Sequence, residues 1–230
     1  MVPLSGRRQA DPGWAAPVLL LAIDTSTPAV TAALHDGTRT VAVSTGVDAR
    51  RHGELLAPQV AAVLQRGGAT PGDLTAIAVG VGPGPFTGLR VGVVTAVTLG
   101  AALHIDVHGI CSLDALAWAS DLAGPFSVVT DARRHEIYWA TYRDRLTRIG
   151  QPAVDRPQQV AAALDTGPVI GPGAGLYPFV DPTQTELSAG ALAEVAVHRL
   201  AAGGELLAPR PLYLRRPDAT VPGTRKPVLT

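Results

Sequence analysis

Cysteine and lysine are almost absent from this chain. Cys111 is the single cysteine among 230 residues, so the chain can form no internal disulfide and no cysteine-ligated metal cluster. Lys226 is the single lysine, against eighteen arginines. A P-loop lysine, a lysine Schiff base and a Ser-Lys catalytic pair are therefore all but excluded. The scarcity of cysteine fits a reducing cytoplasm.

An excess of charge and long apolar segments are missing as well. The formal net charge is zero, so nothing in the composition indicates a strong electrostatic grip on nucleic acid. If RNA is bound, we expect another molecule to hold most of it. No apolar stretch reaches the roughly 18 residues that span a bilayer, and the longest uncharged candidate, 91–103, is too short. Residues 1–17 lack the continuous apolar core of a signal peptide.

What the chain does contain is an alternation of short strands and helices. VLLLAID (18–24) is typical of a buried strand, and a β-branched run and TRTVAVST (38–45) extend it into a predicted meander. Apolar residues at helical spacing predict helices over 51–67, 87–103 and 112–123, and apolar runs predict strands over 74–81 and 105–110. We expect Ser112 to cap the third helix.

The second half opens on FSVVTDARRHEIYWATYRD (126–144), which repeats the strand–Asp–turn–strand layout of the first half. Two such openings suggest a duplicated, two-lobed α/β fold, although the two sequences are hardly alike and chance is an equal explanation. A strand near 146–154, a helix over 157–164, a loop over 167–175 and a helix over 188–202 complete the predicted second half.

The chain therefore divides into four predicted parts. These are an N-terminal extension (1–17), an N-terminal lobe (18–124), a C-terminal lobe (125–205) and a tail (206–230). The tail is polar and broken by proline, so we expect most of it to be extended, with one strand candidate at 211–214.

The segment VGVGPGPFTGLR (79–90) joins a predicted strand to a predicted helix. Gly82, Gly84 and the following helix start could present backbone N–H groups to a phosphate. However, Pro83 and Pro85 carry no N–H group, and no lysine follows. The alternative is a rigid corner in which Thr87 caps the next helix. The residues alone favour the corner somewhat over a phosphate cradle.

Asp24 ends the first predicted strand and is followed by Thr25, Ser26 and Thr27. A carboxylate followed by hydroxyls could orient a nucleotide phosphate and its Mg²⁺. An Asx or ST turn requires the same residues, so both interpretations stay open.

Histidines give no convincing metal or catalytic site. His104, Asp106 and His108 could share a strand face, but His104 falls at a predicted helix end. No second histidine lies one helical turn from His52, so no His-x-x-x-His metal pair forms there. We predict no catalytic residue and no metal site.

Small residues recur every four positions in the helix over 87–103. Gly88, Gly92, Ala96 and Gly100 share one face, and the rest of the helix is apolar nearly all round. Such a helix must be covered on every side. Its own sheet can cover one face, and a second helix, from this chain or from a partner, must cover the other.

Several segments, in their order and spacing, resemble the TsaB (YeaZ) family. They are AIDTSTPAVTAAL, RRHGELLAPQV, AVGVGPGPFTGLRVGVVTA, GICSLDALA, TDARRHEIYWATY and PLYLRR. The match runs from about residue 18 to 215 and is strongest in the first half. The resemblance implies a duplicated actin/Hsp70/sugar-kinase-like fold with a shortened second lobe, and a cytoplasmic protein.

The resemblance also implies a function. Proteins of this family are non-catalytic subunits that support TsaD, which transfers a threonylcarbamoyl group to N6 of adenosine 37 in tRNA, together with the ATPase TsaE. It implies no intrinsic cofactor, with ADP or ATP at the partner interface as an option, and tRNA contact only indirectly. The first two helices of the first lobe would pack against TsaD or a second copy of the chain. The interface residues implied here are Leu55, Leu56, Gly88, Leu89, Gly92, Val93 and Ala96.

Two other classes of function stay open. A metallopeptidase related to glycoproteases would require a metal site. An ATPase or kinase of the same fold would require ATP contacts from both lobes. The residues for such contacts in the first lobe, here called the phosphate-loop-like set, are Asp24, Thr25, Ser26, Gly82, Gly84 and Thr87. A proline stands in GPGPF where many relatives carry a serine, which weakens the case for ATP.

Overall fold

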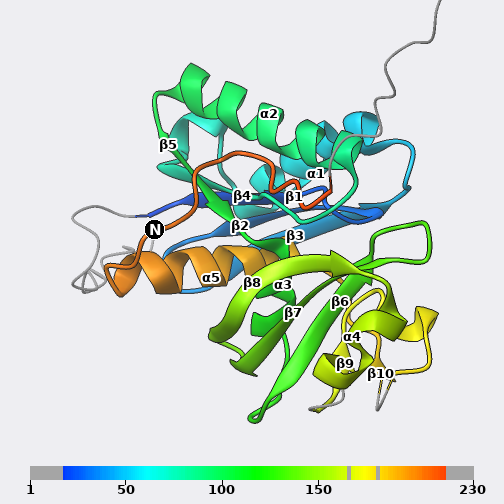
Figure 1. The fold of residues 1–230 in the computed structure, drawn as a ribbon. Coiled ribbons are helices and arrows are strands. Elements are labelled where there is room, and N and C mark those ends of the chain that lie inside the picture. The colour runs from blue at the N-terminus through cyan, green and yellow to red at the C-terminus, as the bar shows by residue number, and fades with distance from the viewer. Residues whose placement is uncertain (1–17, 165–166, 180–181, 216–230) are drawn as a thin grey trace, which may run out of the picture.

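Two five-stranded sheets and five α-helices make up the described chain. The structure, a computed structural model, describes residues 18–164, 167–179 and 182–215 (Figure 1). The predicted N-terminal extension (1–17) and the last part of the predicted tail (216–230) lie outside these residues. Helices cover the outer side of the first sheet and fill the space between the two sheets (Figure 1).

The first sheet carries the meander that the sequence predicts. Its strands lie in the order β3-β2-β1-β4-β5. They are β1 (Leu20–Asp24), β2 (Ala29–His35), β3 (Thr40–Val47), β4 (Ala76–Gly80) and β5 (Asp106–Ile110). β1, β2 and β3 pair antiparallel, whereas β4 pairs parallel with both β1 and β5. Every residue of β1 and β4 is buried, as expected for continuous apolar runs in parallel strands.

The second sheet repeats the topology of the first. Its strands lie in the order β10-β9-β6-β7-β8, so β6 takes the place of β1. They are β6 (Phe126–Asp131), β7 (Ile137–Asp144), β8 (Thr147–Asp155), β9 (Val169–Ile170) and β10 (Pro182–Thr183). The predicted duplication is confirmed. The second copy is the shorter one, because β9 and β10 have two residues each.

The helices follow the same repeat. α1 (His52–Gly67) and α2 (Phe86–Leu103) cover the outer face of the first sheet, with the short turn η1 (Pro71–Asp73) between them. α4 (Pro157–Leu164) stands between β8 and β9 as α1 stands between β3 and β4. The three-residue turn η2 (Ala174–Leu176) stands where the first lobe has α2. Only the first lobe therefore carries a long second helix within the described residues.

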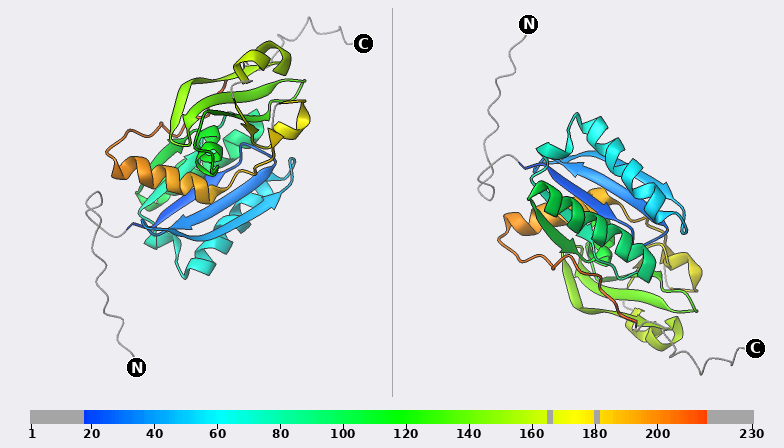
Figure 2. Two further views of the ribbon diagram at one scale, coloured as in Figure 1. Left: turned by 90° about the horizontal axis from the view of Figure 1, so that it is seen from below. Right: turned by 90° about the horizontal axis from the view of Figure 1, so that it is seen from above.

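The two remaining helices, α3 (Ser112–Trp118) and α5 (Ala189–Ala201), lie between the two sheets (Figure 2). We assigned α5 to the C-terminal lobe (125–205), but it packs on the first sheet. The backbone N–H of Ala189 donates to Thr31 Oγ1 at 3.1 Å, and Thr40 Oγ1 donates to Glu194 at 3.2 Å. The reason is that α5 presents a buried face of alanine, glycine and leucine, which fits closely on β1 and β2.

A buried carboxylate ties the two lobes together at this layer. Asp114 of α3 accepts hydrogen bonds from Tyr142 of β7 at 2.8 Å, from Arg148 of β8 at 2.6 Å and from Arg199 of α5 at 2.7 Å. Burial and the Asp114 carboxylate raise the pKa of Tyr142 well above its ordinary value, so its hydroxyl remains a donor. Two cations and a hydroxyl thus compensate one buried charge.

Some predicted boundaries are wrong, each for a local reason. α2 begins at Phe86 with Pro85 as N-cap, so Thr87 lies inside the helix and does not cap it. Ser112 is the first residue of α3, after Cys111, and it is not the cap. α3 also ends at Trp118, before the predicted end at 123. Residues 211–214 form no strand, although the Leu212 N–H donates to the Val81 carbonyl at 2.8 Å.

Replacing Asp114 by asparagine should destabilise the fold. The amide cannot balance Arg148 and Arg199, so two cations would be left without their counter-charge. We expect a decrease on the order of 3 kcal/mol in the free energy of unfolding, measured by urea denaturation. Asp106→Asn at the exposed start of β5 is the matched control and should change little. Equal stability of the two variants would show that Asp114 does not hold the lobes together.

Candidate functional site

Three residues of the phosphate-loop-like set lie at or just after the carboxyl end of β1 and are buried, whereas Thr87 is exposed on α2. Asp24, Thr25 and Ser26 are buried, and the Asp24 and Thr25 side chains bind other groups of this chain. Asp24 accepts from Ser112 Oγ at 2.6 Å and from the Ser26 N–H at 2.6 Å. Thr25 Oγ1 donates to the Gly88 carbonyl at 2.7 Å and accepts from the Gly92 N–H at 3.0 Å.

The glycine-rich segment over 79–90 forms an elbow that sits on this turn. Gly82 has a φ of 94°, in the left-handed region that favours glycine, and its N–H donates to Ser112 Oγ at 3.2 Å. A Cβ at Gly84 would collide with the Ser26 carbonyl oxygen. The elbow backbone therefore lies directly against the Ser26 backbone. These contacts favour a rigid corner over a phosphate cradle.

Asp24 sits in an environment that disfavours its charge. Burial raises the pKa of its carboxyl above the ordinary value of 3.8, and the hydrogen bonds from Ser112 and Ser26 only partly oppose this. Burial also raises the pKa of the Cys111 thiol to about 12, which favours the protonated form over the nucleophilic thiolate. Neither group offers a reactive, solvent-accessible atom.

The small-residue stripe of α2 faces inward, so its predicted role as partner interface is wrong. Gly88, Leu89, Gly92, Val93 and Ala96 are all buried within this chain. A Cβ at Gly92 would lie 2.5 Å from Thr25 Oγ1, and one at Gly88 would lie 2.5 Å from the Thr25 carbonyl oxygen. The small residues let α2 approach the β1–β2 turn closely. That approach, within one chain, explains the four-residue repeat.

The predicted interface residues of α1 are also covered. Leu56 is buried in the core between α1 and the first sheet. Leu55 is half-buried and packs against the same core. Neither leucine is therefore free to contact a partner with its whole side chain.

The outer face of α2 carries the apolar surface instead. Val94 is 61% exposed and Val97 is 42% exposed, and both lie on the side of α2 away from the sheet. On the neighbouring α1, Ala57, Pro58 and Ala61 are exposed as well. We call these five residues the outer helix face. A helix with apolar residues on both sides is what the sequence predicts.

α2 also meets the length and composition of a membrane span. Among the described residues it is the one helix that does so, with 18 residues and a mean hydropathy of 1.6. The expectation that no apolar stretch reaches this length is therefore wrong. It rested on the uncharged residues 91–103, whereas the helix begins at Phe86 and includes Arg90. Its buried residues pack on the sheet as those of a core helix do.

Two open cavities flank Pro85 at the tip of the elbow. The first, of about 370 Å³, lies between the elbow, the β6–β7 turn and the segment at Tyr213. The second, of about 450 Å³, lies between α2, the β1–β2 turn and the start of α1. Arg133 lines both. Within the described part of the chain, no three His, Cys, Asp or Glu side chains gather as metal ligands would.

Substituting Gly92 tests the inward packing of the stripe. Gly92→Ala places a methyl group against Thr25 Oγ1, and we expect it to lower the free energy of unfolding by about 1–3 kcal/mol. Gly53→Ala in α1 is the control, because no atom lies within 4 Å of a Cβ there. It should be neutral or stabilising by up to about 1 kcal/mol. A fully stable Gly92→Ala variant in thermal unfolding would contradict the packing described.

Asp24→Asn tests the buried carboxylate through pH. A raised folded-state pKa means that the stabilising contribution of Asp24 is complete below its ordinary pKa and is lost as pH rises through the folded value. Asparagine cannot ionise. The variant should therefore match or exceed the wild type at neutral pH, and this advantage should vanish on acidification to about pH 4 in urea titrations. A variant that is much weaker at neutral pH would show that the ionised carboxylate stabilises the fold.

Comparisons with known proteins agree on one family. The family model described as TsaD, tRNA N6-adenosine threonylcarbamoyltransferase, matches residues 43–201. An uncharacterized protein of Mycobacterium tuberculosis (strain H37Rv) is 45% identical over 214 residues, or 87% of this chain and 93% of the relative. The Escherichia coli K12 tRNA threonylcarbamoyladenosine biosynthesis protein TsaB is 36% identical over 128 residues, or 54% of each chain.

A solved structure extends the likeness over the whole fold. YeaZ from Pseudomonas aeruginosa is 31% identical with a TM-score of 0.73, and the match covers 86% of this chain and 100% of that one. The duplicated strand order described above is a second argument for this fold, because it does not depend on sequence identity. The chain thus has the duplicated, two-lobed α/β fold of the YeaZ structure and belongs to the TsaB (YeaZ) family.

Proposed function

We propose that this chain is a non-catalytic, cytoplasmic subunit of the complex that makes N6-threonylcarbamoyladenosine in tRNA. The names of its TsaB relatives support a part in that biosynthesis. The match to the TsaD family model supports an origin shared with the transferase itself. The chain would dock on and support TsaD, with TsaE as a further component of the complex.

The observation that carries this proposal is the outer helix face. Val94 and Val97 expose branched apolar side chains on a helix whose opposite side already packs on its own sheet. Removing their remaining exposed surface from water on docking contributes a fraction, about half, of the roughly 1.5–3 kcal/mol that burial of a fully exposed side chain gives. A helix pair from TsaD, or the same helices of a second copy, would cover this face.

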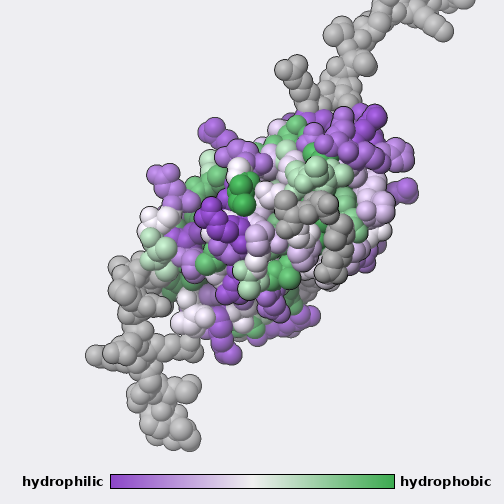
Figure 3. Space-filling model, turned by 60° about the horizontal axis from the view of Figure 1, so that its bottom comes forward, coloured by the Kyte–Doolittle hydropathy of each residue, from purple (hydrophilic) through white to green (hydrophobic). Residues whose placement is uncertain are grey.

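The face of the molecule drawn in Figure 3 carries only scattered apolar residues. Figure 3 shows the molecule with its lower side brought forward, where hydrophobic residues form small groups separated by hydrophilic ones. Such scattered apolar residues are normal on a protein surface. The outer helix face lies on the opposite side, above the first sheet (Figure 1).

The closed turn at Asp24 favours a supporting role over a catalytic one. An ATPase or kinase of this fold needs room for phosphates beside Asp24 and Ser26, and here both residues are buried and the elbow backbone lies against Ser26. A metallopeptidase needs a set of metal ligands. We place ADP or ATP, if the complex holds one, at the interface with the partner and not in this turn.

Charging the outer helix face tests the proposal. A Val94→Arg/Val97→Arg variant should weaken binding to a TsaD partner by at least about tenfold in co-purification and calorimetry, because two cations would be desolvated in an apolar contact. Val47→Arg is the control, since Val47 of β3 is 73% exposed and lies elsewhere. The wild-type chain, but not the double variant, should also restore tRNA modification by TsaD and TsaE.

Three outcomes would overturn the proposal. Unchanged TsaD binding by the double variant would remove the outer helix face as the interface. A stoichiometric tightly bound metal with peptidase activity would indicate the metallopeptidase. Turnover of ATP by the isolated wild-type chain would indicate the kinase or ATPase.

A further inference from the structure

A strip of positive charge surrounds the elbow, although the chain as a whole has no net charge. Arg133, Arg134 and Arg215 line the first cavity beside Pro85, and Arg50, His52 and Arg133 line the second. Of the described residues that line these two cavities, none is Asp or Glu. We call the two cavities together the arginine groove. Arginine recognises phosphate and carboxylate through paired N–H donors.

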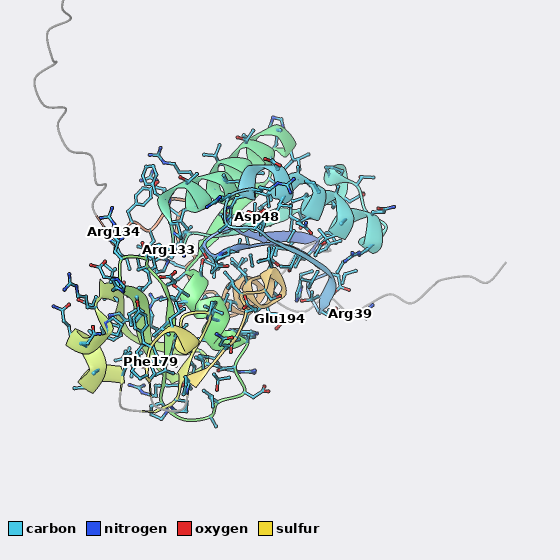
Figure 4. The ribbon with its side chains drawn as sticks, turned by 90° about the vertical axis from the view of Figure 1, so that its right-hand side faces the viewer. Arg39, Asp48, Arg133, Arg134, Phe179 and Glu194 are labelled. Atoms are coloured by element: carbon cyan, nitrogen blue, oxygen red, sulfur yellow. The ribbon has the colours of Figure 1, made fainter. Side chains whose placement is uncertain are left out.

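The fold gathers these arginines from distant parts of the chain. Arg50 precedes α1 in the first lobe, whereas Arg133 and Arg134 belong to the β6–β7 turn of the second lobe. Both turn residues have positive φ values, of 61° and 56°. Figure 4 shows Arg133 and Arg134 side by side at the edge between the two lobes, while Arg39 lies at the opposite edge. The cluster is therefore local, which the net charge of the chain cannot show.

Acidic residues pair with two of the arginines that line the groove. Asp131 pairs with Arg133 at 3.1 Å, and Glu136 pairs with Arg215. The Arg133 side chain is 60% exposed, so its ion pair is weak and can be shared with an incoming anion. Asp48 accepts from the Arg50 backbone N–H at 2.9 Å. Glu54 pairs with Arg51, on the rim, at 2.8 Å.

The aromatic residues at the groove do not offer a free stacking platform. Phe86 stacks on Tyr213 with 5.1 Å between ring centroids, and the Arg90 guanidinium lies 3.9 Å from the Phe86 centroid. Arg90 also donates to the Tyr213 hydroxyl at 3.0 Å. These contacts hold the segment at Tyr213 across the elbow and give the groove a fixed wall. The recognition it offers is of charge, not of a nucleobase.

We propose that the arginine groove binds the phosphate backbone of RNA. The inference rests on the proposed function, in which the complex acts on tRNA. It differs from the expectation that tRNA meets this chain only indirectly. The two cavities share Pro85 and Arg133 and take arginines from both lobes, an arrangement that suits successive phosphates. A free nucleotide held as in kinases would need the turn at Asp24, which the elbow closes. An acidic protein segment is an alternative outcome of the test.

Neutralising two arginines tests the groove. The variant Arg50→Gln/Arg133→Gln removes a cation from each lobe and retains most of the side-chain length. Binding of a labelled, unmodified tRNA transcript to the full chain, alone and with TsaD, is measured by fluorescence anisotropy over a series of salt concentrations. The double variant should bind about tenfold more weakly. Its salt slope should fall by roughly 0.7–0.9 for each phosphate that the groove no longer neutralises.

The control variant carries the same charge change elsewhere. Arg39→Gln/Arg143→Gln replaces two exposed arginines outside the groove and should bind RNA as the wild type does. Thermal unfolding of both variants checks that each is folded. Equal RNA binding by the two double variants, or no RNA binding by the wild type in either form, would overturn the inference. The inference would also be overturned if ATP or a poly-glutamate peptide displaced the labelled RNA from the wild type at a lower concentration than unlabelled RNA does.

Failure of the groove and failure of the proposed function give different results. If the proposed function is wrong, the wild-type chain will not bind TsaD at all. If only the groove is wrong, Arg50→Gln/Arg133→Gln will bind TsaD normally and RNA normally. The supporting result is normal binding to TsaD together with weakened binding to RNA.

Discussion

The close contact between Thr25 and α2 determines most of what this molecule can do. One hydroxyl donates to the Gly88 carbonyl and accepts from the Gly92 N–H, so it bridges two successive turns of the helix. This is feasible only because both helix positions are glycine, since a Cβ at either one would lie 2.5 Å from an oxygen of Thr25. The turn that could have held a phosphate is thereby used to seat a helix. The apolar residues that α2 does not need for this contact, Val94 and Val97, are left on the outside.

The packing between the lobes points in the same direction. One hydrophobic cluster contains residues of both sheets together with α3 and α5, for example Leu20, Phe126 and Leu192. Asp114 adds hydrogen bonds from three other elements within that layer. An enzyme that closes its lobes around a nucleotide would have to rearrange this shared core. A subunit that presents a fixed helical face to a partner benefits from it, because a preformed surface loses less conformational entropy on docking.

The strands and the duplication could be predicted from the sequence better than the direction of the helix faces. Apolar runs and the two strand–Asp–turn–strand openings define the sheets, because burial of a strand is a local property of its residues. The four-residue repeat of Gly88 and Gly92 shows that the small residues share a face. It cannot show what lies opposite, which is Thr25, 63 positions before Gly88 in the chain. Likewise, Ser112 has the right residue type and lies next to the cap position of α3, but its hydroxyl donates to Asp24 at the end of β1.

Charge is the second property that local patterns could not place. A net charge of zero argues against nucleic-acid binding only if the charges are evenly spread. Arg50 and Arg133 are far apart in sequence, yet they line the same cavity beside Pro85, because the fold places a segment of each lobe there. Some of the carboxylates that balance the total pair with Arg133 and Arg215 of the groove, and others lie elsewhere. The geometry of the elbow thus has two consequences. Inward, its backbone lies against the turn at Ser26, and outward, Pro85 lines both cavities of the arginine groove.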